Sequence, residues 1–322
     1  QVARLGAASL TVLERSEYNL YRIEQELRAA WPDLMFDARL GDCVDAATCE
    51  RVFAYARPEI VFHAAAYKHV PLLQHQPREA VRNNVLGTRV VAEAADRHRC
   101  ESFVLISTDK AVNPTSVMGA CKRVAEIFCQ NFAARSATRF ITVRFGNVLD
   151  SAGSVVPLFR EQIRAGGPVT VTHPEISRYF MTIPEACQLI LQAAVLGRGG
   201  EIFALDMGEP VKIRYLAEQM IRLAGKVPGR DVQIVYTGLR PGEKLFEELF
   251  HPLENYRSTA HAKIFLAQPR PVAWELLNAQ LARLADGVDV ADEDALRRDI
   301  SSLLPEFRWR EGEGEVVAFA RP

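Results

Sequence analysis

The sequence lacks a long hydrophobic run. Of its 322 residues, 48% are hydrophobic, yet no apolar stretch approaches about 20 residues, the length that a membrane-spanning helix needs, and no signal peptide is recognisable. We therefore expect a globular protein of the cytoplasm, or the cytoplasmic domain of a longer membrane-anchored protein, with no membrane contact from the chain as given. The length suits one large core or two domains.

Cysteine pairs and an excess of charge of one sign are also absent. The six cysteines form no Cys-x-x-Cys pair and no cluster with histidine, which argues against a metal site or a disulfide framework and favours reduced thiols. The 39 Lys and Arg residues balance 40 Asp and Glu residues, and no long basic block occurs, so we expect no nucleic-acid partner. A local pocket for a small anion stays open.

Strand-like and helix-like segments alternate through the first two thirds of the chain. Short apolar runs rich in β-branched residues predict strands, and amphipathic runs predict helices. The expected strands are 10–13, 35–40, 60–66, 103–107 and 140–144, and the expected helices are 18–31, 47–56, 79–99 and 117–135. Helices of this length between strands predict right-handed crossovers and an α/β fold with a doubly wound parallel sheet of the Rossmann type.

One strand of such a sheet is missing from the sequence. Residues 1–8 are typical of the end of a helix, and nothing before the 10–13 strand supplies a strand or a glycine-rich turn. In the strand order 3-2-1-4-5-6 the first strand is central, and its turn holds the dinucleotide pyrophosphate. We therefore expect the chain to be a fragment, or natural residues to precede Gln1, and we expect weak or absent cofactor binding by the chain as printed.

Beyond residue 148 the pattern changes to a mixture of helices and short strands. Helices are expected at 155–165, 184–196 and 213–224, strands at 201–205 and 232–236, and a helical tail at 272–306 with an acidic first turn at 291–294. This pattern predicts a dinucleotide-binding domain over 1–150. Over 151–322 it predicts a smaller mixed α/β lobe and C-terminal helices, with some segments returning to the main sheet.

Polar side chains gather where the 103–107 strand ends. The Ser-Thr-Asp-Lys run at 107–110 follows an apolar strand, at the edge where open α/β sheets bind ligands. Ser116 is a predicted helix N-cap, and Met118 and Lys122, four residues apart, lie on one face of the helix that follows. We expect the active site here.

The strand ending at Glu14 carries candidate cofactor ligands. An acidic residue there can hydrogen-bond the ribose hydroxyls of an adenine dinucleotide, while the adjacent Arg15 can hold a 2′-phosphate, so NAD and NADP both stay open, with NAD favoured. Ser16 follows in the same turn. Asp42, after the next strand, is placed to meet the adenine ring.

Small residues follow the 60–66 strand. Ala64, Ala65 and Ala66 would let a flat cofactor lie close to the backbone, and Lys68 follows in the same loop. Asn84, which we expect to contact the cofactor, lies inside a helical pattern together with a glycine that costs about 1 kcal/mol of helix propensity relative to alanine, which predicts a packing or hydrogen-bonding role there.

Five ordered motifs resemble one enzyme family. They are STDKAVNPTSVMGACKR, RFGNVLDSAGSVVPLF, VTHPEISRYFMTIPEA, FALDMGEPVKI and GLRPGEKLFEEL. Together with HAAA and NVLGT they resemble the UDP-N-acetylglucosamine 4,6-dehydratases of bacterial surface-polysaccharide pathways, which are extended short-chain dehydrogenase/reductases. The resemblance runs from Gln1 to about Leu266. It implies a nicotinamide cofactor and a UDP-sugar substrate, and we also expect a homo-oligomer.

The resemblance implies roles for the residues of the first motif. Met118 stands where most short-chain dehydrogenases carry a catalytic tyrosine, and because a thioether is neither acid nor base, a variant mechanism is implied. Asp109 would be the acid for the departing 6-hydroxyl and Lys110 the base at carbon 5. Thr108, through a water or with Asp109, would contact the 4-hydroxyl, whose base stays open. Lys122 would bind the nicotinamide ribose.

The other motifs imply the rest of the site. Ser107 and Phe145 are expected beside the cofactor and Asn147 beside the substrate. Ser151 and Ser154 precede a helix whose free N–H groups suit an anion. The expected diphosphate clamps are Arg178 and Arg240, because guanidinium presents paired donors to phosphate oxygens, and Glu243 would bind a ribose hydroxyl.

The expected reaction gives a 4-keto-6-deoxy sugar with retained configuration at carbon 5 and no net redox change. Two alternatives stay open. One is a 4-epimerase or a dehydratase that inverts carbon 5, although the Asp109–Lys110 pair favours dehydration over simple epimerisation. The other is a non-catalytic sensor of dinucleotide or nucleotide sugar, supported only by Met118 and the missing glycine-rich turn.

Overall fold

A six-stranded sheet forms the centre of the molecule. The computed structural model describes residues 1–250, 256–267 and 272–307. The strand order of this sheet is β13-β14-β10-β5-β4-β3. Its strands are β3 (Ile60–His63), β4 (Ser102–Thr108), β5 (Arg139–Phe145), β10 (Glu201–Leu205), β13 (Tyr256–Ser258) and β14 (Ile264–Ala267). The first four are parallel, and β14 runs antiparallel to both of its neighbours. The predicted α/β fold is confirmed.

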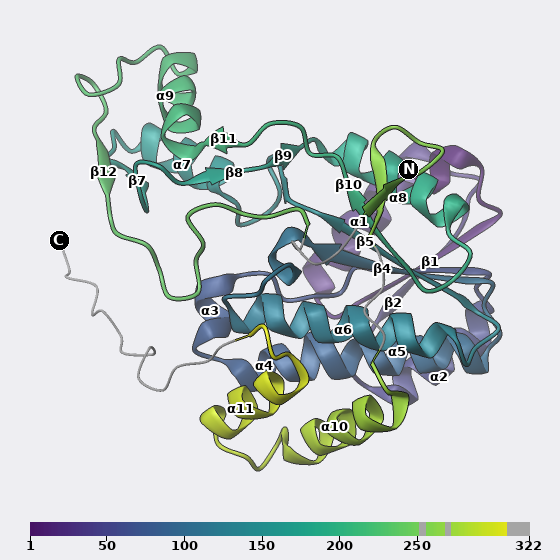
Figure 1. Ribbon diagram of the computed structural model, residues 1–322. Helices are drawn as coiled ribbons and strands as arrows, with labels where there is room; N and C mark the ends of the chain where they lie inside the picture. Colours follow the sequence, from purple (N-terminus) through teal and green to yellow (C-terminus); the bar gives the residue numbers. More distant parts are fainter. Residues whose placement is uncertain (251–255, 268–271, 308–322) are drawn as a thin grey trace.

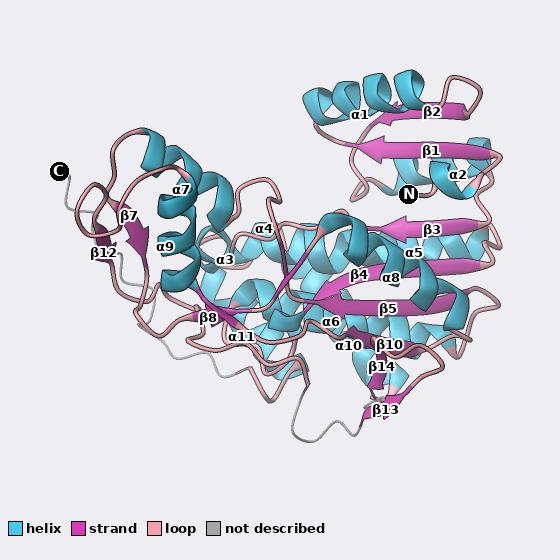
Figure 2. Cartoon of the chain, turned by 90° about the horizontal axis from the view of Figure 1, so that it is seen from above, coloured by secondary structure: helices cyan, strands magenta, loops and turns pink. Residues whose placement is uncertain are grey.

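Two further parallel strands stand apart from this sheet. β1 (Ser9–Glu14) pairs with β2 (Met35–Leu40) and, among the described residues, has no hydrogen-bonded ladder to β3. Figure 2 shows β1 beside β3 with their arrows pointing the same way. The carboxyl ends of β1, β3, β4 and β5 therefore lie on one side. The two sheets part at the position where the sequence predicts the central first strand.

Helices cover both faces of the main sheet (Figure 1). Because successive side chains of a strand point to opposite faces, Phe103 and Leu105 of β4 pack toward α5 (Gly87–Arg97) and α6 (Val117–Ala133). Val104 of the same strand packs in the cluster under α8 (Ile183–Leu196). α1 (Glu17–Ala30) and α2 (Ala46–Ala56) follow the first two strands. Burial on both faces explains why β4 is almost entirely apolar before its last residues.

The predicted helix over 79–99 consists of three successive helical segments. α4 (Pro77–Ala80) continues into a π-helical turn, η2 (Val81–Leu86), and then into α5. The π turn contains Asn84, whose side chain binds the backbone of Tyr67. The weak helix formers noted in the sequence thus coincide with a widened turn, a feature that often accompanies functional sites.

Three further boundaries differ from the sequence prediction. The strand predicted at 60–66 ends at His63. The last residue pair between β3 and β4 is His63 with Leu105, and the three alanines that follow His63 form a loop. The N-terminal helix end is a single 3-10 turn, Ala3–Leu5, closed by Gly6 in a left-handed conformation. The predicted 232–236 strand is β12 (Ile234–Tyr236).

A smaller lobe has its own apolar core. It contains α7 (Val155–Arg164), β7 (Val169–Val171), α9 (Ile213–Leu223) and β12, and β7 pairs with β12. Phe159 and Ile221 are buried between these elements. Two short pairs, β6 (Asn147–Val148) with β9 (Phe180–Met181) and β8 (Ser177–Arg178) with β11 (Val211–Lys212), connect this lobe to the main sheet. By contrast β10, β13 and β14 return to that sheet.

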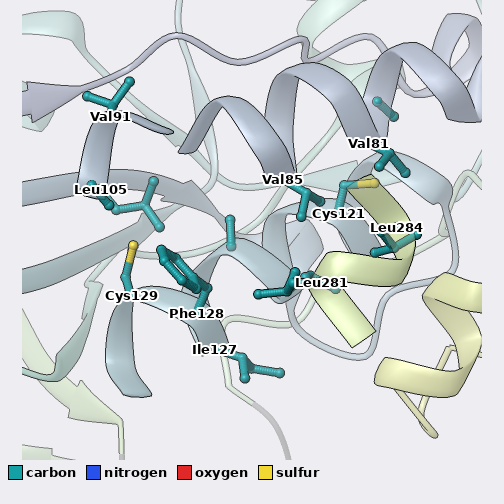
Figure 3. Packing of buried hydrophobic residues seen from close by; sticks show 14 of the residues in the cluster. Val81, Val85, Val91, Leu105, Cys121, Ile127, Phe128, Cys129, Leu281 and Leu284 are labelled. Atoms are coloured by element: carbon teal, nitrogen blue, oxygen red, sulfur yellow. The ribbon is translucent and has the colours of Figure 1, made fainter. Parts of the chain in front are cut away.

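The C-terminal tail is a pair of helices, where the sequence predicts one helical segment. α10 (Trp274–Gly287) ends before a short turn, and α11 (Glu293–Leu303) begins where Asp292 accepts a hydrogen bond from Ala295 N. The acidic residues therefore cap a new helix. Figure 3 shows Leu281 and Leu284 of α10 among the apolar side chains of η2 and α6. Within residues 1–250, 256–267 and 272–307, no helix combines the length and apolarity needed to cross a membrane.

Candidate active site

The loop after β4 is tightly fixed to the start of α6. Thr108 Oγ1 accepts a hydrogen bond from Lys110 N (3.3 Å) and begins a 3-10 turn, η3 (Asp109–Ala111). Ser116 caps α6 by accepting from Gly119 N (3.2 Å). A Cβ added to Gly119 would lie 2.2 Å from the Lys110 carbonyl oxygen. The backbone of α6 therefore touches the loop that carries the candidate acid and base.

Four of the predicted residues meet at this point. Lys110 Nζ lies 3.0 Å from Asp109 Oδ1 and donates to Asn147 Oδ1 at 3.1 Å. Thr108 Oγ1 donates to the same Asp109 oxygen (2.9 Å). Asp109 is 1% exposed and the Lys110 side chain is 20% exposed, so this is a largely buried ion pair and not a pair of solvated surface charges.

The structure adds Glu247, a residue that the sequence prediction missed. Glu247 Oε1 lies 3.5 Å from Lys110 Nζ and 3.7 Å from Arg178 Nε. It belongs to the GLRPGEKLFEEL motif, from which the sequence suggested only Arg240 and Glu243. Glutamates are common in such a segment, and only the fold brings this one to the β4 edge.

Burial and charge act in opposite directions on Lys110. Burial would lower the pKa of Lys110, but the Asp109 and Glu247 carboxylates outweigh it and raise the pKa above its ordinary value. Burial also raises the pKa of Glu247, an effect that Asp109 reinforces and Lys110 opposes. Lys110 is thus an ammonium group in this structure. It can take a proton from carbon 5 only after giving one away.

Lys122 and Met118 lie one helical turn apart below the loop. Lys122 Nζ donates to the Ile106 carbonyl oxygen (2.7 Å). Burial lowers the pKa of Lys122 to about 8, against the opposing charge of Glu126. Met118 is buried in the apolar cluster with Val85 of η2. Its thioether side chain can neither give nor take a proton.

The side chains of two predicted cofactor ligands form hydrogen bonds to other groups inside the protein. The Ser107 hydroxyl donates to Glu126 Oε1 (2.6 Å), a buried carboxylate that also binds Arg144. This side chain therefore faces α6 and not the ligand edge, since it alternates with Thr108 along the strand. The Asn84 amide is fully buried and bonds to Tyr67 N and O, both at 2.9 Å. Asn84 therefore holds the loop after β3 in place, instead of presenting its amide to a cofactor.

The other predicted cofactor residues lie together at the ends of β1, β2 and β3. Arg15 donates to the Tyr67 hydroxyl and lies 3.5 Å from Asp42 Oδ2, while Glu14 accepts from Ser16 N (2.8 Å). The Ser16 hydroxyl caps α1. Ala64, Ala65 and Ala66 form the loop after β3, followed by Lys68, whose pKa burial lowers. Phe145 ends β5 on the α8 side.

The two arginines predicted to bind the diphosphate differ in how accessible their guanidinium groups are. Arg240 is half-exposed and lies 3.2 Å from Glu243 Oε1, so its guanidinium remains accessible. Arg178 is buried. Its Nη1 donates to the Ser177 carbonyl oxygen (2.7 Å), its Nη2 donates to the Lys244 carbonyl oxygen (2.8 Å), and its Nε faces Glu247. In this structure the donors of Arg178 have partners inside the protein, and its role as a diphosphate clamp stays a prediction.

The start of α7 retains a polar site. Ser154 occupies the N-cap position without a side-chain cap bond, and its buried Oγ has no hydrogen-bond partner among the described residues. The Ser151 carbonyl oxygen accepts from Ser154 N at 3.0 Å. In the same described part of the chain, no group of three or more His, Cys, Asp or Glu side chains is arranged to hold a metal ion.

Known proteins are similar to this chain in sequence and in fold. "Capsular polysaccharide biosynthesis protein CapD" of Staphylococcus aureus is 50% identical over 267 residues, which are 82% of this chain and 44% of that protein. The chain spans about half the length of such curated relatives.

Two solved structures resemble it in three dimensions. The X-ray structure of Pen from Bacillus thuringiensis has a TM-score of 0.75 and 30% identity, covering 88% of this chain and 91% of that one. A DesIV double mutant (dTDP-glucose 4,6-dehydratase) from Streptomyces venezuelae, with NAD and DAU bound, has a TM-score of 0.67 and 21% identity, covering 86% of this chain and 87% of that one. A model of one protein family matches residues 1–269, and the chain belongs to that family, described as polysaccharide biosynthesis protein.

Proposed function

We propose that this chain carries the chemistry of a UDP-N-acetylhexosamine 4,6-dehydratase, with UDP-N-acetylglucosamine as substrate and NAD as cofactor. The observation that carries the proposal is the largely buried Asp109–Lys110 pair at the carboxyl end of β4, beside an inert Met118. The product is a 4-keto-6-deoxy sugar nucleotide with retained configuration at carbon 5. It would serve the synthesis of a surface polysaccharide.

The chemistry of dehydration explains why such a pair is needed. A proton at carbon 5 becomes acidic once carbon 4 is a ketone, so elimination needs a base at carbon 5 and an acid at the departing 6-hydroxyl. Adjacent titratable groups of opposite type provide both. Asp109, with Thr108, takes the proton of the 4-hydroxyl and later gives it to the departing hydroxyl. Lys110, once neutral, takes the carbon-5 proton, and its ammonium group, whose protons exchange with solvent, protonates carbon 5 again after elimination.

The residues at the strand ends fit an adenine dinucleotide. Glu14 offers a carboxylate to ribose hydroxyls at the end of β1. The small side chains of residues 64–66 allow a flat cofactor to lie close to the backbone after β3. Lys122 places an ammonium group beneath the loop after β4. Arg15 is already paired with Tyr67 and Asp42. A 2′-phosphate would therefore meet two carboxylates, Glu14 and Asp42, which favours NAD over NADP. Bound NAD would supply hydride chemistry at carbons 4 and 6.

The substrate would lie between the main sheet and the smaller lobe. Asn147, which begins β6 just after β5, is held by Lys110. Arg240 and Glu243 belong to the 238–249 segment. Arg240 binds the diphosphate, Glu243 a ribose hydroxyl, and Ser151 and Ser154 the region at the start of α7.

The test uses the full natural protein with UDP-N-acetylglucosamine and NMR of the product. We expect a 4-keto-6-deoxy sugar of unchanged carbon-5 configuration, with one solvent deuterium at carbon 5 when the reaction runs in heavy water. Asp109→Asn and Lys110→Ala should each lower turnover by about 10²-fold or more.

Glu175→Gln and Lys212→Ala are matched controls, because they break an exposed ion pair of 2.7 Å on the smaller lobe and should leave turnover unchanged. An inverted product, or a product that keeps its 6-hydroxymethyl group, would reject the proposal. Tight binding of dinucleotide and sugar without turnover would favour a sensor instead.

A further inference from the structure

The segment that carries Glu247 is fastened across the candidate active-site loop. Thr115 Oγ1 donates to the Gly242 carbonyl oxygen (3.1 Å), and Lys244 Nζ donates to the Val112 carbonyl oxygen (2.8 Å). Asn113 Nδ2 donates to Glu248 (3.1 Å). These contacts bind residues 242–248 to the stretch between η3 and α6. The position of Glu247 relative to Lys110 is therefore fixed by its neighbours on both sides.

Lys110 lies between two carboxylates that each have an unused oxygen. Asp109 Oδ1 and Glu247 Oε1 face Lys110 Nζ at 3.0 and 3.5 Å. Asp109 Oδ2 and Glu247 Oε2 are buried and, within the described residues, have no hydrogen-bond partner. A buried carboxylate oxygen without a donor is costly. Each carboxylate therefore keeps one buried oxygen that no donor of the described residues occupies.

A simple counter-ion role does not account for Glu247. Arg178, the other cation beside it, already binds the carbonyl oxygens of Ser177 and Lys244 and lies 3.5 Å from Glu243. Lys244 pairs with Glu248 at 3.1 Å. The groups that face Glu247 are thus Lys110 and Asp109 from η3, Arg178 from β8, and Lys244 from its own segment. Glu243 is paired with Arg240 at 3.2 Å, so the carboxylates that face Lys110 are those of Asp109 and Glu247.

We propose that Glu247 is a positioning residue of the reaction that holds the Lys110 side chain and accepts its proton, so that Lys110 reaches carbon 5 as a neutral amine. One N–H bond of the Lys110 ammonium breaks and an O–H bond forms on Glu247, giving an amine and a carboxylic acid with no redox change. The transfer is reversed when the product leaves. This step rests on the proposed dehydratase function.

The timing of the transfer follows from the charges. Before the reaction, two carboxylates stabilise the Lys110 ammonium. When Asp109 takes the proton of the 4-hydroxyl, one of these charges is neutralised and the ammonium becomes a stronger acid toward Glu247. Oxidation at carbon 4 thus primes the base that the next step needs. The internal transfer spares Lys110 from losing its proton to solvent.

The first experiment measures turnover against pH for wild type, Glu247→Gln and Glu247→Asp. We expect Glu247→Gln to lose about 10²-fold at neutral pH and to recover about tenfold per pH unit as solvent removes the proton from Lys110. Glu247→Asp keeps an acceptor and should restore most of the activity without this slope. Glu175→Gln, which lies outside this segment in an exposed ion pair with Lys212, is the control and should keep the pH dependence of wild type.

The second experiment needs neither substrate nor cofactor. The titration midpoint of Lys110, followed by NMR of its labelled ε-carbon, should move to lower pH in Glu247→Gln, because one of its two carboxylate partners is removed. It should stay near the wild-type value in Glu175→Gln. Thermal unfolding checks that each variant is folded, and Glu247→Ala replaces Glu247→Gln in both measurements if Glu247→Gln does not fold.

The outcomes separate this inference from the proposed function. A loss of turnover in Glu247→Gln by one constant factor at every pH, or an unmoved Lys110 midpoint, would overturn the role of Glu247. If wild type forms no 4-keto-6-deoxy product while the midpoint still moves, the dehydratase proposal fails, and the Lys110–Glu247 proton coupling stands.

Discussion

Lys110 and Lys122 are twelve positions apart in one loop and helix, yet their surroundings act on them in opposite ways. Lys110 lies between the carboxylates of Asp109 and Glu247, which hold its pKa above the ordinary value although burial opposes them. Lys122 is buried against a backbone carbonyl, and burial lowers its pKa to about 8 in spite of Glu126. One lysine needs a proton acceptor before it can act as a base, whereas the other is close to losing its charge.

The charge of Lys122 predicts a pH dependence of cofactor binding. Its pKa is lowered to about 8, so the ammonium is present below this pH and is lost as pH rises through it. We expect the affinity of the full natural protein for NAD, measured by fluorescence titration, to fall above about pH 8. Lys122→Arg should remove this fall, because guanidinium stays charged. A fall with the same midpoint in Lys122→Arg would contradict the assignment.

At the level of single residues, the sequence predicts the polar residues that directly follow the strands of the main sheet. It misses the residues that distant segments bring to the same site. Asp109, Lys110 and Asn147 were expected at the ends of adjacent parallel strands, and they are in contact. Glu247 comes from a segment far along the chain, and no local pattern distinguishes it from Glu243 or Glu248. The internal partners of Arg178 are likewise a property of the packed segment, which no local pattern in the sequence predicts.

At the level of elements, the close contact between α6 and η3 predicts the effect of one methyl group. In Gly119→Ala the new Cβ would lie 2.2 Å from the Lys110 carbonyl oxygen, a backbone atom that cannot move aside cheaply. We expect a loss of about 1–3 kcal/mol in unfolding free energy and a larger loss of turnover, because the loop with Asp109 and Lys110 is displaced. Denaturant unfolding and product NMR measure the two effects.

Gly287→Ala is the matched control, since its Cβ would meet Ala291 at an ordinary 3.6 Å at the end of α10. It should leave turnover unchanged and raise stability by about 0.4–1 kcal/mol. Equal behaviour of the two variants would show that the contact at Gly119 is of no consequence.

The helices and strands that the sequence predicts well are those with a strong local signal. β2 was expected at its observed bounds, and α2 within one residue, because an alternating or amphipathic pattern extends over each. The π turn at η2 and the end of β3 were not expected. Both depend on contacts with distant residues, namely the hydrogen bond between Asn84 and the backbone of Tyr67 and the pairing of β3 with β4.

At the scale of the whole molecule, the C-terminal helices are part of the main core and reach toward the site. Arg297 of α11 donates to the Gln74 carbonyl oxygen (2.8 Å), and Gln74 Oε1 accepts from Val117 N at the start of α6 (3.1 Å). Leu281 of α10 is fully buried in the same cluster as Met118 (Figure 3). We infer that α10 and α11 unfold together with the sheet and are not an independent unit.

Truncation of one buried leucine tests this cooperativity. Leu281→Ala should lower the free energy of unfolding by about 2–5 kcal/mol through lost burial and a residual cavity, while the unfolding curve keeps a single transition in circular dichroism and in tryptophan fluorescence. Leu276→Ala, in the same helix but 55% exposed, should change it by no more than about 0.5 kcal/mol. When Trp31 and Trp309 are changed to Phe in every variant, fluorescence follows Trp274 at the start of α10, whereas circular dichroism follows all helices. A fluorescence transition that separates from the circular dichroism transition in Leu281→Ala would mean that the helical pair detaches first, and that the support it gives to Gln74 and the start of α6 is lost before the sheet unfolds.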